Sequence, residues 1–403
     1  MTWSIILLLF LLSCTIPCTS ALAGFPQLGS SKAAPSVTTR NSELTRSSEL
    51  IATHRLIEAE STLKELLHQN KNDAEAMNLL GVVRGQQEKK EEAEILFRNA
   101  LDVEPNLASA HANLGLLYLQ EGRPERSMDE YEAALKIDPF LKEATTGMVG
   151  VAEQQALAAR KDGDLEKGLS ILIRARKSLP AEPRLLYDFG MLAIQMKLYE
   201  DGAQALEQAL KLEPDAPNMI YALARARLEQ QKMAEAERLM REYLKLRPED
   251  PTAHYGLGRV LSIQLQTDAA RVEFERSIDL QPQQAESYYE LGQLELDARH
   301  DDKALELFEK VLARNPKHGG ALTGAGIVAY RRKDYAKAEE YLKAAVANVP
   351  DFVTAHYYNG LALGHLGRKS ESEKELAVAS QMSDSQDQEK HRGLKLASPD
   401  TKP

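Results

Sequence analysis

The stretches AHYGLGRVLS, residues 253–262, and SYYELGQLEL, residues 287–296, decide the fold of this chain. Each contains a Leu-Gly pair shortly after a tyrosine, and one fixed step along the chain carries Gly258 to Gly292. Proline cannot continue a helix, so a proline that recurs with such a period marks a turn between helical repeats. Prolines do recur with this same step at Pro105, Pro139, Pro180, Pro214, Pro248, Pro282, Pro316 and Pro350. The step is longer only between Pro139 and Pro180.

Small residues keep the same register as the prolines. Glycine inside a helix costs about 1 kcal/mol relative to alanine, so a glycine that returns at one phase indicates close packing between two helices. A second small residue, such as Ala93 or Ala270, is followed four positions later by a large apolar one, here Phe97 or Phe274. Further glycines in the register of Gly258 and Gly292 are Gly81, Gly115, Gly190, Gly326 and Gly360.

This pattern resembles the tetratricopeptide repeat, a helix-turn-helix unit of about 34 residues with Leu-Gly, then A-x-x-x-F, then proline. Leu257, Gly258, Ala270, Phe274 and Pro282 carry it in one repeat. The resemblance covers residues 42–379 and implies an all-α, right-handed superhelical solenoid of about ten helix-turn-helix units.

Two repeats depart from the pattern. Residues 140–180 form a repeat seven residues too long, which predicts a first helix lengthened by about two turns. Residues 40–73 lack the Leu-Gly pair but keep Ala59, Leu63 and Leu66, so we expect an N-terminal cap.

The first 23 residues are typical of an export signal. They carry no charged side chain, and Ala21-Leu22-Ala23 before Gly24 has the pattern of a secretory cleavage site. Both cysteines, Cys14 and Cys18, lie in this segment, so the mature chain would contain no thiol. An uncleaved anchor or a buried apolar start is the alternative, and LLSC, ending at Cys14, also resembles a bacterial lipoprotein processing box.

The remaining segments differ in composition. Residues 24–41 are rich in Gly, Pro, Ser and Thr and are predicted to be a flexible linker. Residues 42–379 form the predicted solenoid. Residues 380–403 lack apolar spacing and are predicted to be a disordered C-terminal tail.

Chemistry-bearing motifs are sparse. The nine histidines include no H-E-x-x-H and no pair at metal-ligand spacing, so we expect no metal, no cofactor and no catalytic residue. GAGIVA, residues 324–329, matches a dinucleotide fingerprint only superficially, because it follows no predicted strand. The net charge of −10, from 60 acidic and 50 basic residues, favours solubility and argues against general binding of nucleic acid.

A row of tyrosines supplies the candidate site. Each precedes the small packing residue by three positions, and the resemblance places this point of the first helix on the concave face. Arg225 and Arg259 follow Tyr221 and Tyr255 by one helical turn and should share their face. Tyr288, one position out of phase, should point toward the packed helices instead. The candidate partner-binding residues are Tyr187, Tyr221, Arg225, Tyr255, Arg259 and Tyr289.

Two interpretations of this row remain open. The tyrosines could support neighbouring first helices, as aromatic residues commonly do at this position of such repeats. Alternatively they contact a ligand, for which a ring beside a guanidinium offers apolar area and an anchor for carboxylates. The row begins Asn78, Ala112, Tyr187, so it is not the carboxylate clamp of cytosolic relatives, nor does the chain carry the asparagine ladder of the sugar transferases.

The sequence therefore predicts a non-catalytic scaffold, exported to the periplasm or secreted from a bacterium, that binds a protein or peptide segment in the concave groove. One alternative is a substrate-recruiting subunit of an envelope enzyme or transferase. Another is a lipid-anchored structural adaptor, which requires Cys14 or Cys18 to be retained and modified; only in that case would a membrane be a partner.

Overall fold

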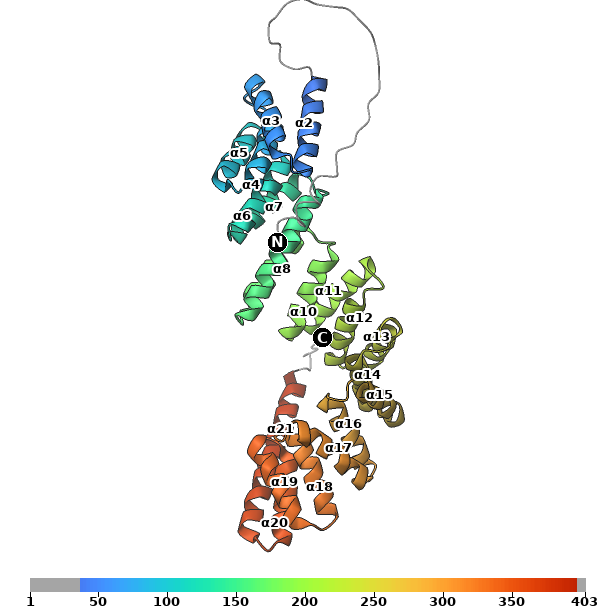
Figure 1. Cartoon of the computed structure of the whole chain (residues 1–403). Coiled ribbons are helices and arrows are strands. Elements are labelled where there is room, and N and C mark those ends of the chain that lie inside the picture. Colours follow the sequence, from blue (N-terminus) through green and yellow to red (C-terminus); the bar gives the residue numbers. More distant parts are fainter. Residues whose placement is uncertain (1–36, 397–403) are drawn as a thin grey trace, which may run out of the picture. The chain divides into compact units, whose positions relative to one another are not determined.

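The computed structural model describes residues 37–396, with side chains for residues 37–383. Within this part the chain forms twenty helices and no strand (Figure 1), so the all-α prediction is confirmed. The helices fall into two compact units, an N-terminal unit ending at Pro214 and a C-terminal unit beginning at Asp215. The predicted export signal, and the predicted linker as far as residue 36, lie outside the described residues.

The helices are of similar length in both units. The N-terminal unit contains α2 (Val37–Ala52), α3 (Leu56–Gln69), α4 (Ala74–Gln86), α5 (Lys90–Val103), α6 (Ala108–Gln120), α7 (Pro124–Ile137), α8 (Lys142–Lys161), α9 (Leu165–Ser178), α10 (Pro183–Gln195) and α11 (Tyr199–Leu212). The C-terminal unit contains α12 (Pro217–Glu229), α13 (Met233–Leu246), α14 (Pro251–Ile263), α15 (Thr267–Leu280), α16 (Ala285–Asp297), α17 (Asp301–Arg314), α18 (Gly319–Arg331), α19 (Tyr335–Asn348), α20 (Val353–His365) and α21 (Lys369–Leu396).

Consecutive helices pack as hairpins, α2 with α3 through α20 with α21. In each hairpin the even-numbered helix is the first helix and the odd-numbered one the second. A residue with left-handed backbone closes the turn inside each hairpin: Gly122, Gly163 and Gly367 in three of them, and a non-glycine residue such as Leu265, with φ 62°, in the other seven. The ten hairpins match the predicted number of repeats.

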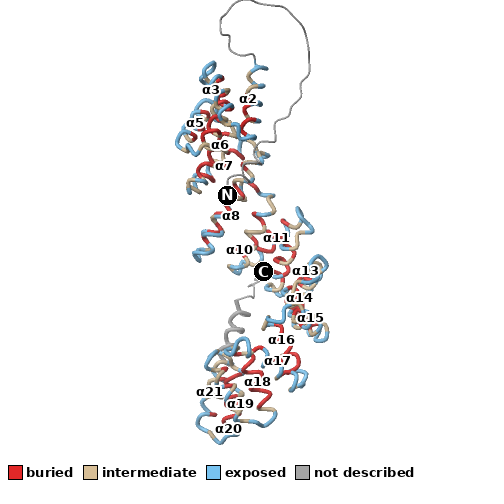
Figure 2. Tube along the Cα trace, in the orientation of Figure 1, coloured by how far each residue is buried: buried red, intermediate tan, exposed pale blue. Residues whose placement is uncertain are grey.

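Glycine and a large side chain meet inside the hairpins, as the register predicted. An ideal Cβ added to Gly258 would lie 2.6 Å from Phe274 Cε1, and one added to Gly292 would lie 2.7 Å from Phe308 Cε1. Both rings are fully buried. The facing helices can approach this closely only because the first helix carries no side chain there. Figure 2 shows buried residues, in red, that recur within the helices of both units.

Helix α8 is the lengthened first helix. It has 20 residues, whereas α6 and α10 have 13 each. The difference is seven residues, or two turns, which confirms the prediction for this repeat. Met148 and Val151 are buried within its length.

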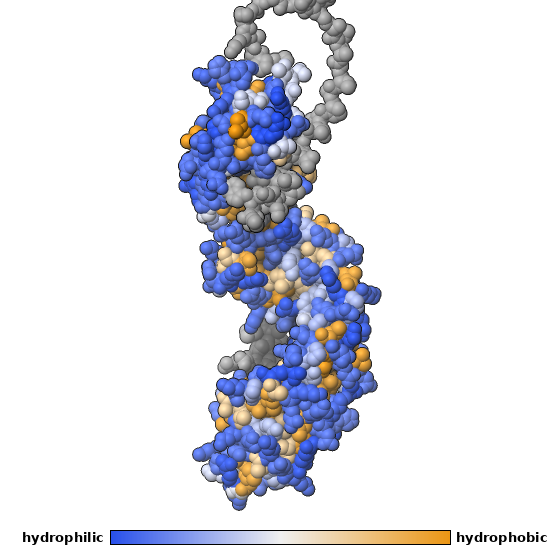
Figure 3. Space-filling view, in the orientation of Figure 1, coloured by the Kyte–Doolittle hydropathy of each residue, from blue (hydrophilic) through white to orange (hydrophobic). Residues whose placement is uncertain are grey.

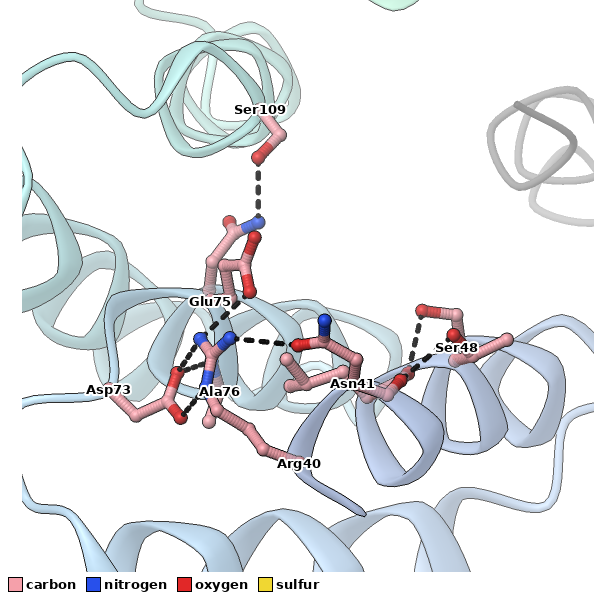
Figure 4. Close-up of polar contacts among 10 residues, drawn as sticks. Arg40, Asn41, Ser48, Asp73, Glu75, Ala76 and Ser109 are labelled. Atoms are coloured by element: carbon pink, nitrogen blue, oxygen red, sulfur yellow. Dashed lines mark hydrogen bonds and ion pairs between the residues drawn. The ribbon is translucent and has the colours of Figure 1, made fainter. Parts of the chain in front are cut away.

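Helix α2 begins at Val37, inside the segment that the sequence assigned to a flexible linker, so that boundary was wrong. The reason lies in contacts distant in sequence. Arg40 donates from Nε to Asp73 Oδ2 at 2.6 Å and from Nη2 to Glu75 Oε2 at 2.8 Å (Figure 4). Leu50 and other apolar side chains of α2 are buried, so α2 packs into the first hairpin, the repeat for which the sequence predicted a cap.

Helix α21 continues through Leu396, past the predicted start of the C-terminal tail at residue 380. Glu, Lys, Gln and Arg are good helix formers, and residues 381–394 contain several of them. The backbone therefore stays helical there without the apolar spacing on which the prediction relied; residues 397–403 lie outside the described part. None of the described helices combines the length and the apolar character that crossing a membrane requires.

Candidate functional site

The predicted tyrosines occupy one phase of successive first helices. Tyr221 lies on α12, Tyr255 on α14 and Tyr289 on α16, all in the C-terminal unit, and each is half-buried. Tyr187 occupies the equivalent point of α10, in the N-terminal unit. The structure thus brings three of the four tyrosines into one compact unit.

The three rings pack against the second helices of their own hairpins. The ring centroid of Tyr221 lies 5.1 Å from that of Tyr243, and the centroid of Tyr255 lies 6.1 Å from that of Phe274. Burial raises the hydroxyl pKa of Tyr221 and of Tyr255. Tyr221 and Tyr255 therefore pack within their own hairpins, whereas the supporting role left open by the sequence concerned neighbouring first helices.

Tyr289 also reaches the next repeat. Its ring centroid lies 6.3 Å from that of Phe308 and 4.8 Å from that of His318, the N-cap residue of α18. A Cβ on Gly320 would lie 2.6 Å from its hydroxyl oxygen, so any larger residue there would displace the ring. Gln293 Nε2 donates to the same oxygen at 3.0 Å.

Tyr288 points into the protein, as predicted. Only 8% of it is exposed, and the Arg314 guanidinium carbon lies 4.7 Å from its ring centroid. Lys310 Nζ lies 5.8 Å from the same centroid. The second of the adjacent tyrosines, Tyr289, is thus the one in the candidate row.

The two arginines are exposed, but they differ in their partners. Arg225 has no ion-pair partner among the described residues, whereas Arg259 Nε lies 3.7 Å from Glu290 Oε1 on α16. Burial raises the pKa of Glu290, and Arg259 opposes that shift. Arg259 therefore links two neighbouring first helices, a contact that the sequence analysis did not predict.

The row is interrupted at α18. Thr323 holds the tyrosine position, is 2% exposed, and donates from its hydroxyl to Gly319 O at 2.9 Å. Residues 321–329 of this helix are all buried, as the red tube of Figure 2 shows. The register resumes on α20 with Tyr357, which is 47% exposed.

In the N-terminal unit, Tyr187 is followed by a carboxyl group in an unfavourable setting. Burial of Asp188, together with the negative charge of Glu153 on α8, raises the pKa of Asp188 to about 6. Arg184 donates to Glu153 at 2.6 Å. Tyr187 thus has a carboxyl group next to it and Met191 one turn later, where Tyr221 and Tyr255 are followed by arginines.

The surface offers few other functional groupings. Hydrophilic residues dominate the face drawn in Figure 3, with hydrophobic ones scattered among them. In the described part of the chain, no three His, Cys, Asp or Glu side chains gather closely enough to hold a metal ion.

Comparison with family models assigns the family. The model for the tetratricopeptide repeat matches residues 83–141, 154–217, 187–251, 221–285, 263–318, 289–351 and 323–385, which together cover more than half of the chain. This chain belongs to the tetratricopeptide repeat family. The repeats found by the model have the register that Gly258 and Gly292 revealed.

Solved structures similar to this tetratricopeptide repeat protein match it with low sequence identity and with TM-scores below 0.5. YrrB, described as a tetratricopeptide repeat protein with an unusual peptide-binding site, is 23% identical, matches 46% of this chain and 95% of its own, and has a TM-score of 0.39. MamA from Desulfovibrio magneticus RS-1, from residue 41 of its chain to the end, is 19% identical over 42% of this chain and 97% of its own, with a TM-score of 0.40.

The Cut9-Hcn1 hetero-tetramer of the APC/C is also similar to this chain. It is 14% identical over 86% of this chain and 87% of the matched chain, with a TM-score of 0.43. No curated protein matches the sequence. At these identities the similarity concerns the fold and does not indicate what this chain binds.

Two neighbours of the candidate residues were missed by sequence reasoning. Gln293 lies one repeat length after Arg259, so the repeat register could have revealed it. Glu290 could not be found in that way, because Gly256 and Gly324 fill its position in the adjacent tetratricopeptide repeats. Its pairing with Arg259 depends on side-chain directions on two different first helices.

Proposed function

We propose that this tetratricopeptide repeat protein is a non-catalytic scaffold that binds an extended or helical protein segment along the first helices of its C-terminal unit. The observation that carries the proposal is a repeated pair on α12, α14 and α16: a half-buried tyrosine followed one turn later by Arg225, Arg259 or Gln293. Tyr187 has the same register in the sequence but lies in the N-terminal unit, so it stays a separate prediction.

The arginines set the chemistry of the partner. Arg225 is exposed and has no ion pair in the described part of the chain, so it is available for a carboxylate. A carboxylate that reaches Arg259 has to compete with Glu290 at 3.7 Å. Burial raises the pKa of Glu290, so the ionised form of this competitor is less well stabilised than it would be in water. An acidic segment is therefore the preferred ligand.

The tyrosines contribute their exposed edges. They are half-buried, so they are fixed in place by packing and present apolar area with little further loss of conformational freedom. Energy at protein interfaces usually concentrates in a few aromatic and arginine side chains. The proposed role adds to the supporting role of these rings and does not replace it.

The test uses a partner captured from the native host with the full chain. Arg225→Ala with Arg259→Ala should weaken its binding about tenfold or more, because each such side chain is often worth about 1–2 kcal/mol. Arg238→Ala, which removes an exposed arginine from the second helix α13, should leave the affinity unchanged. Added salt should weaken the wild type more than the double variant. An unaltered dissociation constant in the double variant would contradict the proposed site.

We further propose that the protein is exported and processed before Gly24. The uncharged apolar start and the small residues at Ala21 and Ala23 support this. N-terminal sequencing of the native product should begin at Gly24, and its emission should lack tryptophan, because Trp3 is the only tryptophan. A product that begins at Met1 would contradict export, and one that begins at a lipid-modified Cys14 or Cys18 would favour the membrane-anchored adaptor.

A further inference from the structure

Three histidines repeat one arrangement near the start of a first helix. They lie on α6, α14 and α20, directly before the tyrosine position of the candidate row. In each case Nδ1 contacts a glutamate of the following second helix and Nε2 contacts the carbonyl oxygen of the proline in the preceding turn. The residues are His111 with Glu130 and Pro105, His254 with Glu273 and Pro248, and His356 with Glu375 and Pro350.

The distances are those of hydrogen bonds on both sides of each ring. From Nδ1 to the glutamate Oε2 they are 2.7, 2.6 and 2.6 Å for His111, His254 and His356. From Nε2 to the proline oxygen they are 3.2, 3.0 and 2.9 Å. The side chains are largely shielded, with exposed fractions of 18%, 13% and 8%.

Both neighbours of each ring can only accept a hydrogen bond. An ionised carboxylate has no proton to donate, and a backbone carbonyl never has one. A neutral imidazole carries a single N–H, so it satisfies one neighbour and turns a lone pair toward the other. Only the doubly protonated imidazolium completes both contacts. The hydrogen bond to Glu130 accordingly raises the pKa of His111, and no other charged side chain among the described residues contributes to that shift.

The remaining repeats show that the fold does not require histidine there. Four other repeats have a buried side chain without an imidazole at the equivalent position. These residues are Leu186, Ile220, Tyr288 and Leu322. Three repeats therefore carry an ionisable group where an apolar one would pack.

We propose that His111, His254 and His356 form a pH-sensitive clamp that tightens three hairpins when the rings are protonated and loosens them when each ring loses a proton. The clamp joins each first helix to its own second helix and to the turn that leads in from the preceding repeat. It needs no partner to form. One copy lies in the N-terminal unit, on α6 and α7, and two lie in the C-terminal unit, on α14 with α15 and on α20 with α21.

The sign of the effect follows from linkage. His111, whose pKa is raised in the folded state, adds stability that is fully present below its unfolded pKa, about 6.5 for histidine, and that is lost as the pH rises through the folded value. Each unit of such a rise changes the ratio of folded to unfolded protein about tenfold across that window. The wild type should therefore lose stability as the pH rises from about 5.5 to 8.

The first experiment compares pH profiles of the melting temperature of the full chain. A triple variant, His111→Leu, His254→Leu and His356→Leu, should show a markedly flatter profile between about pH 5.5 and 8 than the wild type. Leucine is the natural residue at this position in two other repeats. Asp188, whose pKa of about 6 lies in the same window, is present in both proteins, so the difference isolates the histidines. His68→Gln, a change at an exposed histidine, should keep the wild-type profile.

A second variant and a direct measurement keep the test independent of the leucine substitutions. Glu130→Gln, Glu273→Gln and Glu375→Gln remove the carboxylates but preserve the shape of the three sites, and this variant should also flatten the profile. In the wild type, nitrogen-detected NMR near pH 6.5 should show N–H protons on both ring nitrogens of the three histidines. Parallel melting profiles for the wild type and both triple variants, or a single N–H on each of these rings, would overturn the proposal.

Discussion

At the scale of single residues, Tyr131 shows how a repeat position can be filled imperfectly. Its side chain is fully buried on α7 and fits against Gly115 and Gly147. Its hydroxyl has no hydrogen-bond partner among the described residues, and the hydroxyl of Ser127 donates to Gly115 O at 2.7 Å. Burial raises the hydroxyl pKa of Tyr131. The equivalent position holds Phe97, Phe274 and Phe308 in other repeats.

Tyr131→Phe should therefore raise the free energy of unfolding. A buried donor without a partner costs about 1–3 kcal/mol, so we expect a gain of about 1 kcal/mol, visible in urea denaturation as a higher midpoint with an unchanged slope. Tyr118→Phe is the matched control in the same part of the chain. The Tyr118 hydroxyl donates to Glu94 Oε1 at 3.0 Å and accepts from Arg98, so its removal should lower stability. A loss of stability in Tyr131→Phe would mean that its hydroxyl is satisfied in solution.

At the scale of the helix, α4 contains a matched pair of glycines. A Cβ on Gly81 would lie 2.5 Å from Phe97 Cε1, whereas one on Gly85, a turn later, meets nothing within 4 Å. Gly81→Ala should cost about 1–3 kcal/mol by forcing the buried ring aside. Gly85→Ala should add up to about 1 kcal/mol through helix propensity alone. Urea denaturation of both variants checks the two signs. Equal effects would show that the ring is not in contact with α4 in solution.

The helices were predictable from the sequence because their signals are local or strictly periodic. The wider spacing between Pro139 and Pro180 predicted the length of α8, and Gly258 predicted the approach of Phe274. The start of α2 was missed because it depends on Arg40 reaching Asp73, 33 residues away. A composition rich in Ser and Thr carries no sign of such a contact.

The candidate site was predictable in position but not in its contacts. The register located Tyr221, Tyr255 and Tyr289, yet it named no partner for Arg259, which the structure places beside Glu290. Glu295 shows the same limit: it is 1% exposed and pairs with Arg271 and Lys303, at a position where leucine stands in two other repeats. The contacts of His111, His254 and His356, by contrast, could have been predicted from the sequence. A glutamate follows each of these histidines at the same sequence separation.

At the scale of the whole molecule, stability should spread from hairpin to hairpin. In a repeat protein each unit contacts mainly its neighbours, so damage stays local before it becomes global. Gly258→Leu places a branched side chain where even a Cβ would lie 2.6 Å from Phe274, which should cost about 1–3 kcal/mol or more. We expect amide hydrogen exchange to accelerate first in α14 and α15, then in α13 and α16, which pack against them. The helices α4 to α7 of the N-terminal unit should keep their protection, because none of them shares a hairpin with Gly258 or lies next to one that does.

Hydrogen exchange with mass spectrometry under native conditions separates these segments. Gly150→Ala is the control, because a Cβ at that position meets nothing within 4 Å. This variant should leave every segment at least as protected as in the wild type. Equal loss of protection in Gly258→Leu across residues 72–379 would contradict nearest-neighbour stability and would require the two compact units to unfold together.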